Sequence, residues 1–310
     1  MSPLLVVGSV ARDTIHNHLG THELVLGGSA TFASLAGSFF APVRLVGVVG
    51  RDFPDEKVQL LRDRGIDVRG LEVVEGKTFF WEGRYSDDLT SRESLATELG
   101  VFASFHPKIP AEHRTTPYVM LGNIDPDLQV EVLDQIREPK LVIADTMNFW
   151  ISGKPLELAK MLKRIDLLVI NEEESRQLAG VHNIAKAARA LLAMGPRIVV
   201  IKRGEYGALL FDGESVFSAP AYPVEDVLDP TGAGDTFAGG LLGHLAKEDR
   251  IDARTLRRAV IHGSVLASFC VEGISVDRLV RVTHQEIADR YGAFARLAHF
   301  ATGSEIDALE

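Results

Sequence analysis

The sequence predicts a doubly wound α/β fold, in which helices sandwich a mainly parallel sheet and a small β lid projects from it. From residue 118 onward, short apolar runs alternate with amphipathic segments, which is the pattern of parallel strands joined by helices. Near the N-terminus, a continuously apolar run over 4–7 ends at Gly8, as a buried strand does. Residues 79–85 alternate in a way that suits a second, exposed sheet.

The main body is expected to take its elements in a regular order. Short apolar runs are interpreted as strands, and amphipathic segments closed by Gly65 or by Gly195-Pro196 are interpreted as helices. The expected strands are 4–9, 44–50, 118–121, 141–145, 167–170 and 198–201. The expected helices are 27–36, 56–64, 127–137, 156–163, 172–178, 184–194 and 283–300.

No internal repeat or linker interrupts the sequence, so residues 1–310 are expected to form a single domain. The lid is expected from two segments within it, about 12–26 and 76–104. Such a lid would cover a site and exclude water. The plainer alternative is an edge hairpin whose aromatic side chains belong to the core.

Composition narrows the classes of function. The 310 residues are 46% hydrophobic and 25% charged, which is ordinary for a globular protein. A net charge of -10 argues against a nucleic-acid backbone or an anionic membrane surface as partner. Cys270 is the only cysteine, which excludes a disulfide framework. No apolar stretch approaches the roughly 18 residues of a membrane helix, and no basic leader precedes Arg12, so we expect a cytoplasmic protein.

The most informative stretch is 229–240, which reads Asp-Pro-Thr-Gly-Ala-Gly-Asp-Thr-Phe-Ala-Gly-Gly. Gly232, Ala233 and Gly234 lie where a turn enters an apolar helix. Small residues there let the backbone approach a ligand, and the free N–H groups of a helix start form an anion site. Asp235 follows in the first turn, where a carboxylate suits taking a proton from an attacking hydroxyl. The plainer alternative is that Asp235 complements the helix dipole and the glycines pack a tight corner.

Further polar groups follow predicted strands, at the edge where open α/β sheets bind ligands. Asp13 comes shortly after the first strand and is either a ligand contact or a surface turn acid. Asn171 and Glu174 come directly after the strand 167–170. They suit a water-ligated Mg²⁺ and nucleotide phosphates, although their spacing is also that of a helix capping box.

The turn 202–207 reads Lys-Arg-Gly-Glu-Tyr-Gly and joins two apolar runs. Gly204 and Gly207 allow a tight turn that either passes over a nucleotide or forms an ordinary hairpin. The sequence has no Gly-x-x-x-x-Gly-Lys-Ser/Thr run, which excludes a P-loop. It also has no complete Gly-x-Gly-x-x-Gly run, so a nicotinamide dinucleotide site has little support.

Taken together, these residues resemble the ribokinase (PfkB) family of sugar and nucleoside kinases, over nearly the whole chain from Gly8 to about Gly273. The stretch 229–237 is similar to the second signature of the family, with Pro230 where many members have threonine or another small residue. Gly27-Gly28 looks like the start of the first signature, and 171–174 is similar to the Asn-x-x-Glu motif for magnesium and phosphate. The resemblance implies a ribokinase-like fold and an ATP-dependent phosphotransferase that uses an alcohol acceptor and Mg²⁺.

The resemblance also implies roles for individual residues. Asp235 would be the catalytic base, and the anion hole would be formed by Gly232, Ala233 and Gly234. The acceptor would be held by Asp13, Gly27, Gly28 and Thr31. ATP would contact Asn171, Lys202, Gly204, Gly207, Gly234 and His262. Metal contacts would be Glu174, through water, for Mg²⁺, and Asp229, Thr231, Ser268, Val271 and Gly273 for a monovalent cation such as K⁺.

Two departures from the family pattern bear on the acceptor. Ala11 and Thr31-Phe32 stand where ribokinases usually place asparagines, which removes hydrogen bonds that a ribose pocket would use. The acceptor therefore stays open between a sugar or sugar-like compound and a nucleoside of the adenosine, inosine or cytidine type. Aromatic side chains in the lid suit stacking on a base or a sugar face, namely Phe79, Phe80, Trp81 and Tyr85.

The sequence also leaves open the partner and two rival functions. The expected partner is a small-molecule substrate, and the exposed edge of the lid is a candidate homodimer contact. One rival is a catalytically silent member of the fold that only binds ligand, although every catalytic position is filled. Another rival is a dinucleotide-dependent oxidoreductase.

Overall fold

The computed structural model describes residues 1–89, 91–213 and 215–299. Within them, a nine-stranded sheet has the order β13-β12-β11-β10-β9-β8-β1-β4-β5, parallel from β5 to β11 and antiparallel at β12 and β13. The predicted mainly parallel sheet is therefore confirmed. Its strands are β1 Leu4–Val7, β4 Val43–Gly50, β5 Asp67–Val74, β8 Tyr118–Leu121, β9 Leu141–Asp145, β10 Leu167–Asn171, β11 Ile198–Lys202, β12 Ala208–Phe211 and β13 Val216–Ala219.

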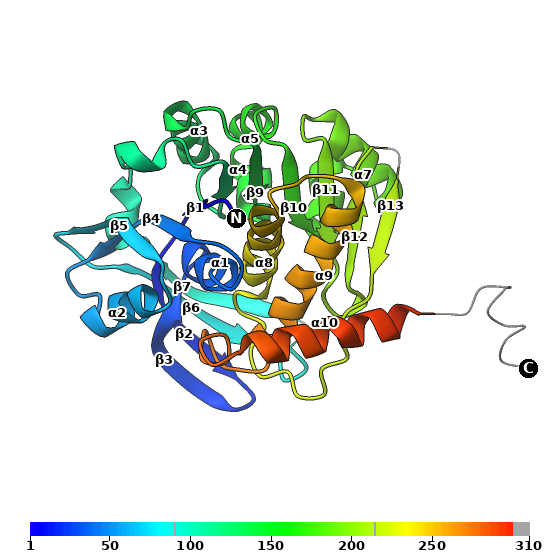
Figure 1. Ribbon diagram of the computed structural model, residues 1–310. Helices are drawn as coiled ribbons and strands as arrows, with labels where there is room; N and C mark the ends of the chain where they lie inside the picture. The colour runs from blue at the N-terminus through cyan, green and yellow to red at the C-terminus, as the bar shows by residue number, and fades with distance from the viewer. Residues whose placement is uncertain (90, 214, 300–310) are drawn as a thin grey trace, which may run out of the picture.

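Helices cover both faces of this sheet, and Figure 1 shows α1, α8 and α9 on the face toward the viewer. The core on this face also includes α2, and the core on the opposite face is formed with α3, α4, α5 and α7. The helices are α1 Ser29–Gly37, α2 Asp55–Asp63, α3 Pro126–Gln135, α4 Asn148–Gly153, α5 Pro155–Leu162, α6 Glu172–Ala179, α7 Ile184–Ala193, α8 Ala233–Glu248, α9 Ala253–Cys270 and α10 His284–Ala298.

The central strand β1 shows why continuously apolar runs predict this architecture. Leu4 and Val6 pack into the core under α1 and α8, whereas Leu5 and Val7 pack into the core under α3 and α5. Successive side chains of a strand point to opposite faces, so a strand covered on both sides must be apolar at every position.

The four remaining strands form a second, smaller sheet with the order β3-β2-β6-β7. They are β2 Ala11–Asn17, β3 Gly20–Gly27, β6 Phe79–Tyr85 and β7 Arg92–Glu98. β2 and β6 pair in parallel, and the outer two pairs are antiparallel. The two predicted lid segments thus meet in one small sheet, which we call the lid sheet; Figure 1 shows it below the main sheet.

Several elements differ from the sequence prediction, and the edge strand β13 was not predicted. β5 was not predicted, because this edge strand is only partly buried and carries charged residues between its apolar ones. The short helix α4 lies before the predicted helix at 156–163, and α9, the 18-residue helix after α8, was not assigned from sequence. The C-terminal helix ends at Ala298, and the last predicted position, 300, lies outside the described residues.

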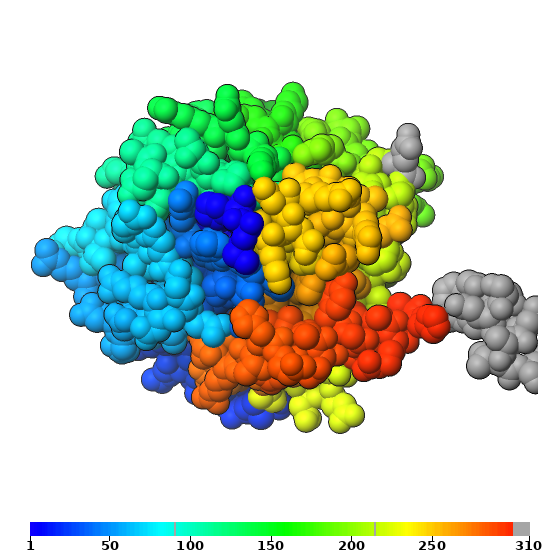
Figure 2. All heavy atoms as spheres, viewed as in Figure 1, coloured from blue at the N-terminus to red at the C-terminus, as the bar shows by residue number. Residues whose placement is uncertain are grey.

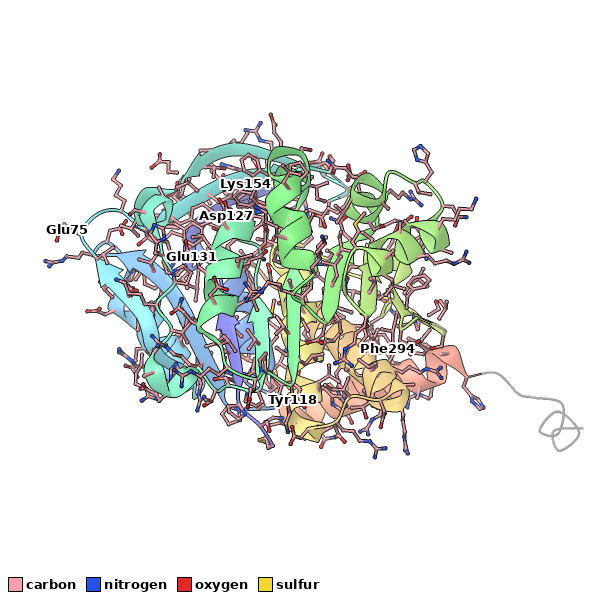
Figure 3. All side chains as sticks on the ribbon, turned by 90° about the horizontal axis from the view of Figure 1, so that it is seen from above. Glu75, Tyr118, Asp127, Glu131, Lys154 and Phe294 are labelled. Carbon is pink, nitrogen blue, oxygen red and sulfur yellow. The ribbon has the colours of Figure 1, made fainter. Side chains whose placement is uncertain are left out.

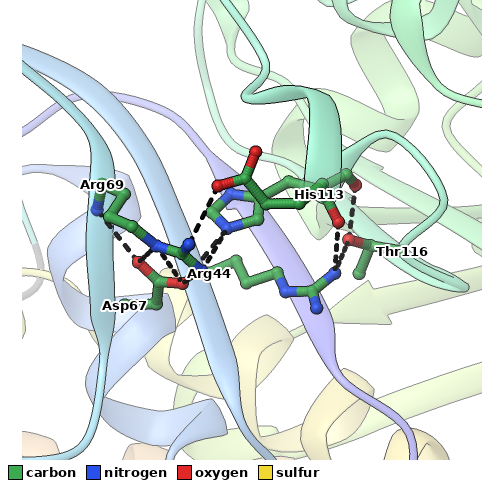
Figure 4. Close-up of polar contacts among 6 residues, drawn as sticks. Arg44, Asp67, Arg69, His113 and Thr116 are labelled. Carbon is green, nitrogen blue, oxygen red and sulfur yellow. Dashed lines mark hydrogen bonds and ion pairs between the residues drawn. The ribbon is translucent and has the colours of Figure 1, made fainter.

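Polar contacts close the ends of the strands away from the glycine-rich helix start. Figure 4 shows Arg69 and His113 converging on the carboxylate of Asp67, with Nε2 of His113 3.1 Å from Oδ2. Nearby, Arg44 donates to the hydroxyl of Thr116 at 2.7 Å. These contacts tie β4 and β5 to the segment that leads into β8, so this cluster of charged side chains is explained by the fold.

On the face of the sheet covered by α3 and α5, Lys154 bridges the starts of the two helices. Its ammonium lies 2.7 Å from Asp125 and 2.8 Å from Asp127, and Figure 3 shows Lys154 and Asp127 together at that face. This ion pair therefore also has a structural explanation.

The helix α10 lies across α9 and buries Ile287 and Phe294 against the segment after α1. Figure 2 shows it as a continuous ridge on one side of the molecule. Among the described residues, no helix combines the length and hydropathy that a bilayer span requires.

Candidate active site

The carboxyl ends of three neighbouring strands bring polar side chains to one edge of the main sheet. Asp145 ends β9, Asn171 ends β10 and Lys202 ends β11, and Asn171 is the direct neighbour of Lys202 in the ladder. Nζ of Lys202 lies 2.7 Å from Oδ2 of Asp145. This is the sheet edge at which open α/β folds bind ligands.

The start of α8 meets this edge. Gly232 is the residue before the helix and has φ of 75°, in the left-handed region that glycine adopts without strain. No side chain caps the helix, so N–H groups of its first turn are available to an anion, except that of Ala233, which donates to the Pro230 carbonyl at 3.2 Å. A Cβ atom added to Gly234 would lie 2.9 Å from Nζ of Lys202, so the ammonium is next to the helix start.

Asp235 lies in the first turn of α8, as predicted. Burial raises the pKa of its carboxyl group to about 7, and the negative charge of Asp145 raises it further, against the opposing effects of Lys202 and Arg92. A carboxylate with this pKa is able to accept a proton near neutral pH.

Asn171 and Glu174 form the capping box that was the alternative explanation of their spacing. Oδ1 of Asn171 accepts from the Glu174 N–H at 2.7 Å, and Oε2 of Glu174 accepts from the Asn171 N–H at 3.1 Å. The capping box does not exclude a ligand role, because Glu174 also interacts with Asp145 and Lys202. Burial and the charge of Asp145 raise the pKa of Glu174 to about 7.

The charges around this edge fit a divalent cation held through water. Carboxylates outnumber the one buried ammonium of Lys202, and burial raises the pKa of both Glu174 and Asp235. Among the described residues, no three acidic, histidine or cysteine side chains are arranged to hold a metal directly. Magnesium often keeps several waters and uses few protein ligands, so the donor set is compatible with it.

On the other side of the site, Asp13 projects from the lid strand β2 and lies over Gly27 of β3. A Cβ atom at Gly27 would be 2.0 Å from Oδ2 of Asp13, so only glycine leaves room for this carboxylate. Asp13 is 5% exposed. Burial raises its pKa to about 7, and Asp229 and Asp235 raise it while Lys57 and Arg92 lower it. The structure therefore brings Asp13 and Asp235 into one site.

Gly28 and Thr31 shape the backbone next to Asp13. Gly28 has φ of 96°, and a Cβ atom there would be 2.4 Å from the carbonyl oxygen of Ser9. Thr31 was predicted to contact the acceptor, but it is fully buried and its hydroxyl donates to the Gly27 carbonyl at 2.7 Å. Its side chain therefore fixes the turn and is not presented to a ligand.

The turn with Gly204 and Gly207 follows β11 at the same edge of the sheet. It closes through a hydrogen bond from the Arg203 N–H to the Gly207 carbonyl at 2.8 Å, and Arg203 also pairs with Glu172 at 2.6 Å. The exposed ring of Tyr206 lies 5.7 Å from the Arg203 guanidinium. The position beside Lys202 is compatible with a nucleotide contact.

His262 does not have the environment expected of an adenine-side residue. Its ring is stacked between those of His244 and Tyr291, with both centroid distances 4.3 Å, and Phe40 meets its edge. Because both faces of the ring are covered by protein, neither face is open to a base. We therefore correct this prediction and assign His262 to the packing between α8, α9 and α10.

The five residues expected to hold a monovalent cation are close in space but already bonded. The two carboxylate oxygens of Asp229 accept from the N–H groups of Thr231 and Ser275, both at 2.9 Å. The Val271 carbonyl accepts from two N–H groups, and the Ser268 hydroxyl accepts from the Arg290 guanidinium at 3.0 Å. The Thr231 hydroxyl shares a hydrogen bond with that of Tyr85. The Gly273 N–H donates to the Cys270 carbonyl. Carboxylate and carbonyl oxygens each have two lone pairs, so these hydrogen bonds do not decide whether the group holds a monovalent cation, which stays a prediction.

Two residues of the site, Asp145 and Arg92, were not assigned from sequence, and Tyr85 was assigned only as a stacking aromatic. Asp145 ends a predicted strand, which is a usable signal, but its partner Lys202 is 57 positions away. Tyr85 and Arg92 come from facing strands of the lid sheet. The Tyr85 hydroxyl shares a hydrogen bond with that of Thr231 at 2.9 Å, which ties the lid sheet to the start of α8.

A surface cavity of about 490 Å³ lies beside this arrangement. Its lining residues belong to the segment just before Asp229 and to the loop after α9: Val224, Glu225, Asp226, Leu228, Glu272 and Arg278. We place the active site at Asp235 because the buried charged groups of five elements, β2, β9, β11, α6 and α8, interact there.

Comparison with known proteins agrees with this geometry. The profile of the pfkB family carbohydrate kinases matches residues 118–279. The chain is 33% identical over 252 residues to a cytidine kinase of Thermococcus kodakarensis, an alignment that covers 78% of this chain and 88% of that protein. It is 25% identical over 298 residues to a ribokinase of Arabidopsis thaliana, covering 87% and 76% of the two chains.

Solved structures agree on the fold. A nucleoside kinase of Burkholderia thailandensis in complex with inosine superposes with a TM-score of 0.75 at 19% identity, covering 94% of this chain and 98% of that chain. An E. coli protein described as a putative ribokinase II, in complex with ATP and Mg²⁺, gives a TM-score of 0.78 at 18% identity, covering 94% and 100%. The chain therefore has the ribokinase fold and belongs to the PfkB family of carbohydrate kinases, phosphotransferases that use an alcohol group as acceptor.

Proposed function

We propose that this protein is an ATP-dependent kinase that phosphorylates the hydroxymethyl group of a nucleoside, with Asp235 as the general base. The observation that carries the proposal is the meeting of two buried carboxylates, Asp235 at the start of α8 and Asp13 on the lid sheet, beside an uncapped helix start. Asp13 is placed to hold the hydroxyl groups of the acceptor, and Asp235 is placed to take the proton of the attacking hydroxyl.

Each group then has a defined task in the transfer. The acceptor oxygen attacks the γ-phosphorus of ATP, the bond from that phosphorus to the bridging oxygen breaks, and Asp235 takes the proton of the attacking hydroxyl. The N–H groups at Gly232 and Gly234 bind the phosphoryl oxygens, and the Ala233 N–H joins them when it leaves the Pro230 carbonyl. Lys202 lies beside Gly234 and adds a positive charge. Asp13 and the backbone at Gly27 and Gly28 orient the acceptor.

Glu174 would hold Mg²⁺ through water, with Asn171 nearby, and the bound ion would neutralise negative charge on the phosphates. ATP would lie along the carboxyl ends of β10 and β11, with the turn at Gly204 and Gly207 beside it. In this orientation the γ-phosphate of ATP would lie next to Lys202, the last residue of β11.

A nucleoside is favoured over a simple sugar by the aromatic residues of the lid sheet. Phe79 stacks on Phe102 at 5.6 Å, and Tyr85 is buried with its hydroxyl on Thr231. Phe80 alternates with its neighbours and so lies on the opposite face of β6. Trp81 shares a face with Asp13, its direct partner across the ladder, and is only partly buried.

Contacts within the lid sheet also fix the position of the Trp81 ring. Its Nε1 donates to the Ser94 hydroxyl at 3.1 Å, and a Cβ atom at Gly83 would lie 2.1 Å from two of its ring atoms. The indole thus lies across Gly83 on the side of the lid sheet that carries the acceptor acid. A rigid, partly exposed aromatic ring in that place is suited to stack on a nucleobase. The similarity to the cytidine kinase of T. kodakarensis supports the same acceptor class.

The test is ADP release from Mg-ATP with a panel of pyrimidine and purine nucleosides, free sugars and sugar phosphates. We expect turnover with a nucleoside and at least tenfold lower kcat/KM with ribose, since ribose has no base to stack on the Trp81 ring, which costs about 1–3 kcal/mol. Preference for a free sugar would refute the nucleoside assignment. ATP binding without turnover on any acceptor would favour the silent ligand-binding alternative.

Replacing Trp81 with alanine is expected to raise KM for the nucleoside about tenfold with little change in kcat, on a stacking energy of about 1–3 kcal/mol per base. Gly83→Ala is expected to act in the same direction, because the new methyl group displaces the indole without removing it. Phe80→Ala is the matched control, because it removes an aromatic ring from the same strand on the other face. Initial rates against nucleoside concentration give the three KM values.

Fluorescence gives a second measurement that does not need turnover. The chain has two tryptophans, so Trp150→Phe leaves Trp81 as the one emitter. Stacking of a base should change its emission on titration with nucleoside, and Gly83→Ala in that background should weaken the change. An unchanged emission together with an unchanged KM in Trp81→Ala would place the base elsewhere.

A further inference from the structure

An arginine of the lid sheet lies near the start of α8. Arg92 is the first residue of β7 and pairs directly with Tyr85, the last residue of β6. Residues directly opposite in a ladder project from the same face, so Arg92 shares the face of Tyr85 and Trp81. The hydroxyl of Tyr85 bonds Thr231, one residue before Gly232. This corner of the lid sheet therefore lies at the start of α8.

The charge of Arg92 acts on three acids from three separate elements. It lowers the pKa of Asp13 on β2, of Glu174 on α6 and of Asp235 on α8. Coulomb interactions weaken with distance and are screened by water, so all three acids lie within reach of the charge of Arg92. Its Cζ atom is 5.5 Å from the centre of the Trp81 ring, which places it beside the proposed base platform.

The other cation that acts on both Glu174 and Asp235 is already bonded to the protein. Lys202 is largely buried, and its ammonium lies 2.7 Å from Asp145. Arg92 lies on an exposed strand, and the groups that it contacts there, the Tyr85 hydroxyl and the Trp81 ring, are uncharged, so its charge is directed to a ligand. An arginine presents five N–H donors in a planar fork that matches phosphate oxygens.

We propose that Arg92 is a catalytic residue, which binds the transferred phosphoryl group from the lid side while the N–H groups of 232–234 bind it from the helix side. The inference rests on the proposed kinase function and deepens it. During transfer, the bond between the acceptor oxygen and the γ-phosphorus forms, the bond to the ADP oxygen breaks, and the proton of the acceptor passes to Asp235. Negative charge spreads over three phosphoryl oxygens in that transition state, and Arg92 neutralises part of it.

The experiment compares wild type with Arg92→Ala and Arg92→Lys. Loss of one such donor should lower kcat about 10²–10³-fold, with less than a threefold change in KM for the acceptor. Arg92→Lys should recover part of the loss, because it restores the charge but not the planar fork. The measurement uses the best acceptor from the panel, whether nucleoside or sugar, so a wrong acceptor class does not obscure the result.

Arg84→Ala is the matched control. Arg84 is an exposed arginine of the neighbouring strand β6, one residue before Tyr85 and so on the opposite face, and it pairs with Glu93 across the ladder. Arg84→Ala removes the same charge from the same sheet, and its kcat and KM should stay within twofold of those of wild type. Melting temperatures of all variants check that the lid sheet is intact.

Calorimetry provides a readout besides turnover. Mg-ADP with aluminium fluoride and the acceptor mimics the phosphoryl group in transfer, and Arg92→Ala should weaken its binding at least tenfold while Mg-ADP alone binds as in wild type. Unchanged kcat in Arg92→Ala would overturn the proposal. A raised acceptor KM with unchanged kcat would also overturn it, and would assign Arg92 to acceptor binding. Absence of phosphoryl transfer in wild type would instead refute the proposed function.

Discussion

Asp235→Asn should lower kcat about 10²–10⁴-fold, the usual contribution of a general base, and should leave the affinity for Mg-ATP within a few fold. Asparagine has the same shape and cannot accept the proton of the acceptor hydroxyl. The N–H groups of Gly232 to Gly234 and the Lys202 ammonium remain in place, so phosphate binding persists. Initial rates of ADP release and calorimetry with Mg-ATP measure the two quantities separately.

The same variant should not be less stable than wild type, and this separates loss of chemistry from loss of fold. Burial raises the pKa of Asp235 from 3.8 in its ordinary state to about 7. Between these values the folded protein binds the proton more tightly than the unfolded chain, so this group lowers stability as pH rises through that range. Asparagine carries no charge to bury. At pH 8 the variant should therefore melt at or above the temperature of wild type.

Asp249→Asn is the control for this experiment. Asp249 lies at the other end of α8, where it pairs with Lys140 at 2.8 Å on the surface. The substitution makes the same chemical change on the same helix and should leave kcat within twofold of wild type. Activity of Asp235→Asn close to that of wild type would remove Asp235 from the mechanism.

The parts of the fold that could be predicted from sequence are those with local signals. The strands β8 to β11 are continuous apolar runs because both of their faces are buried, and the helices between them end at glycine or have periodic apolar faces. The glycine-rich start of α8 has its own composition, so its position and that of Asp235 follow directly from the sequence.

The parts that could not be predicted depend on contacts between distant segments. Asp145 and Lys202 are each ordinary residues at strand ends, and only the sheet order makes them an ion pair. Arg92 lies in a polar run whose face is defined by its pairing with β6. His262 occupies the position of an adenine-side residue in sequence, but His244 and Tyr291, from two other helices, cover its ring. The monovalent-cation residues are gathered as expected, yet Arg290 from α10 and backbone N–H groups already bond them.

The stacked histidines make the folded protein sensitive to acid. Burial lowers the pKa of His262 to about 3 and that of His244 to about 4, and nearby Arg258 and Lys247 lower both while Glu248 opposes the change at His244. No hydrogen-bond partner meets Nδ1 of His262 or either ring nitrogen of His244 among the described residues. Both rings are therefore neutral in the folded protein at pH 7.

We expect these two rings to cost about 4 kcal/mol of unfolding free energy between pH 7.5 and pH 5, about 2 kcal/mol each. In the unfolded chain a histidine has an ordinary pKa of 6.5, so below that pH the unfolded state binds more protons than the folded state. The stabilising contribution of the neutral rings is thus complete above pH 6.5 and is lost progressively as pH falls toward about 4 and then 3. Urea unfolding at the two pH values measures the difference.

Protonation of the buried acids changes the unfolding free energy in the opposite sense. The contribution of the histidines is therefore measured by comparing variants. Asp13, Glu174 and Asp235 have raised pKa values, and their protonation favours the folded state as pH falls toward 5.

His262→Phe keeps an aromatic ring between His244 and Tyr291 but removes one titrating group, while the three buried acids are unchanged. Its unfolding free energy should fall about 2 kcal/mol less than that of wild type over the same pH change. His182→Phe, at an exposed position, is the matched control for the loss of an imidazole. An identical pH dependence in His262→Phe and wild type would mean that the ring of His262 carries its proton inside the folded core, in contradiction to the stacking that covers both its faces.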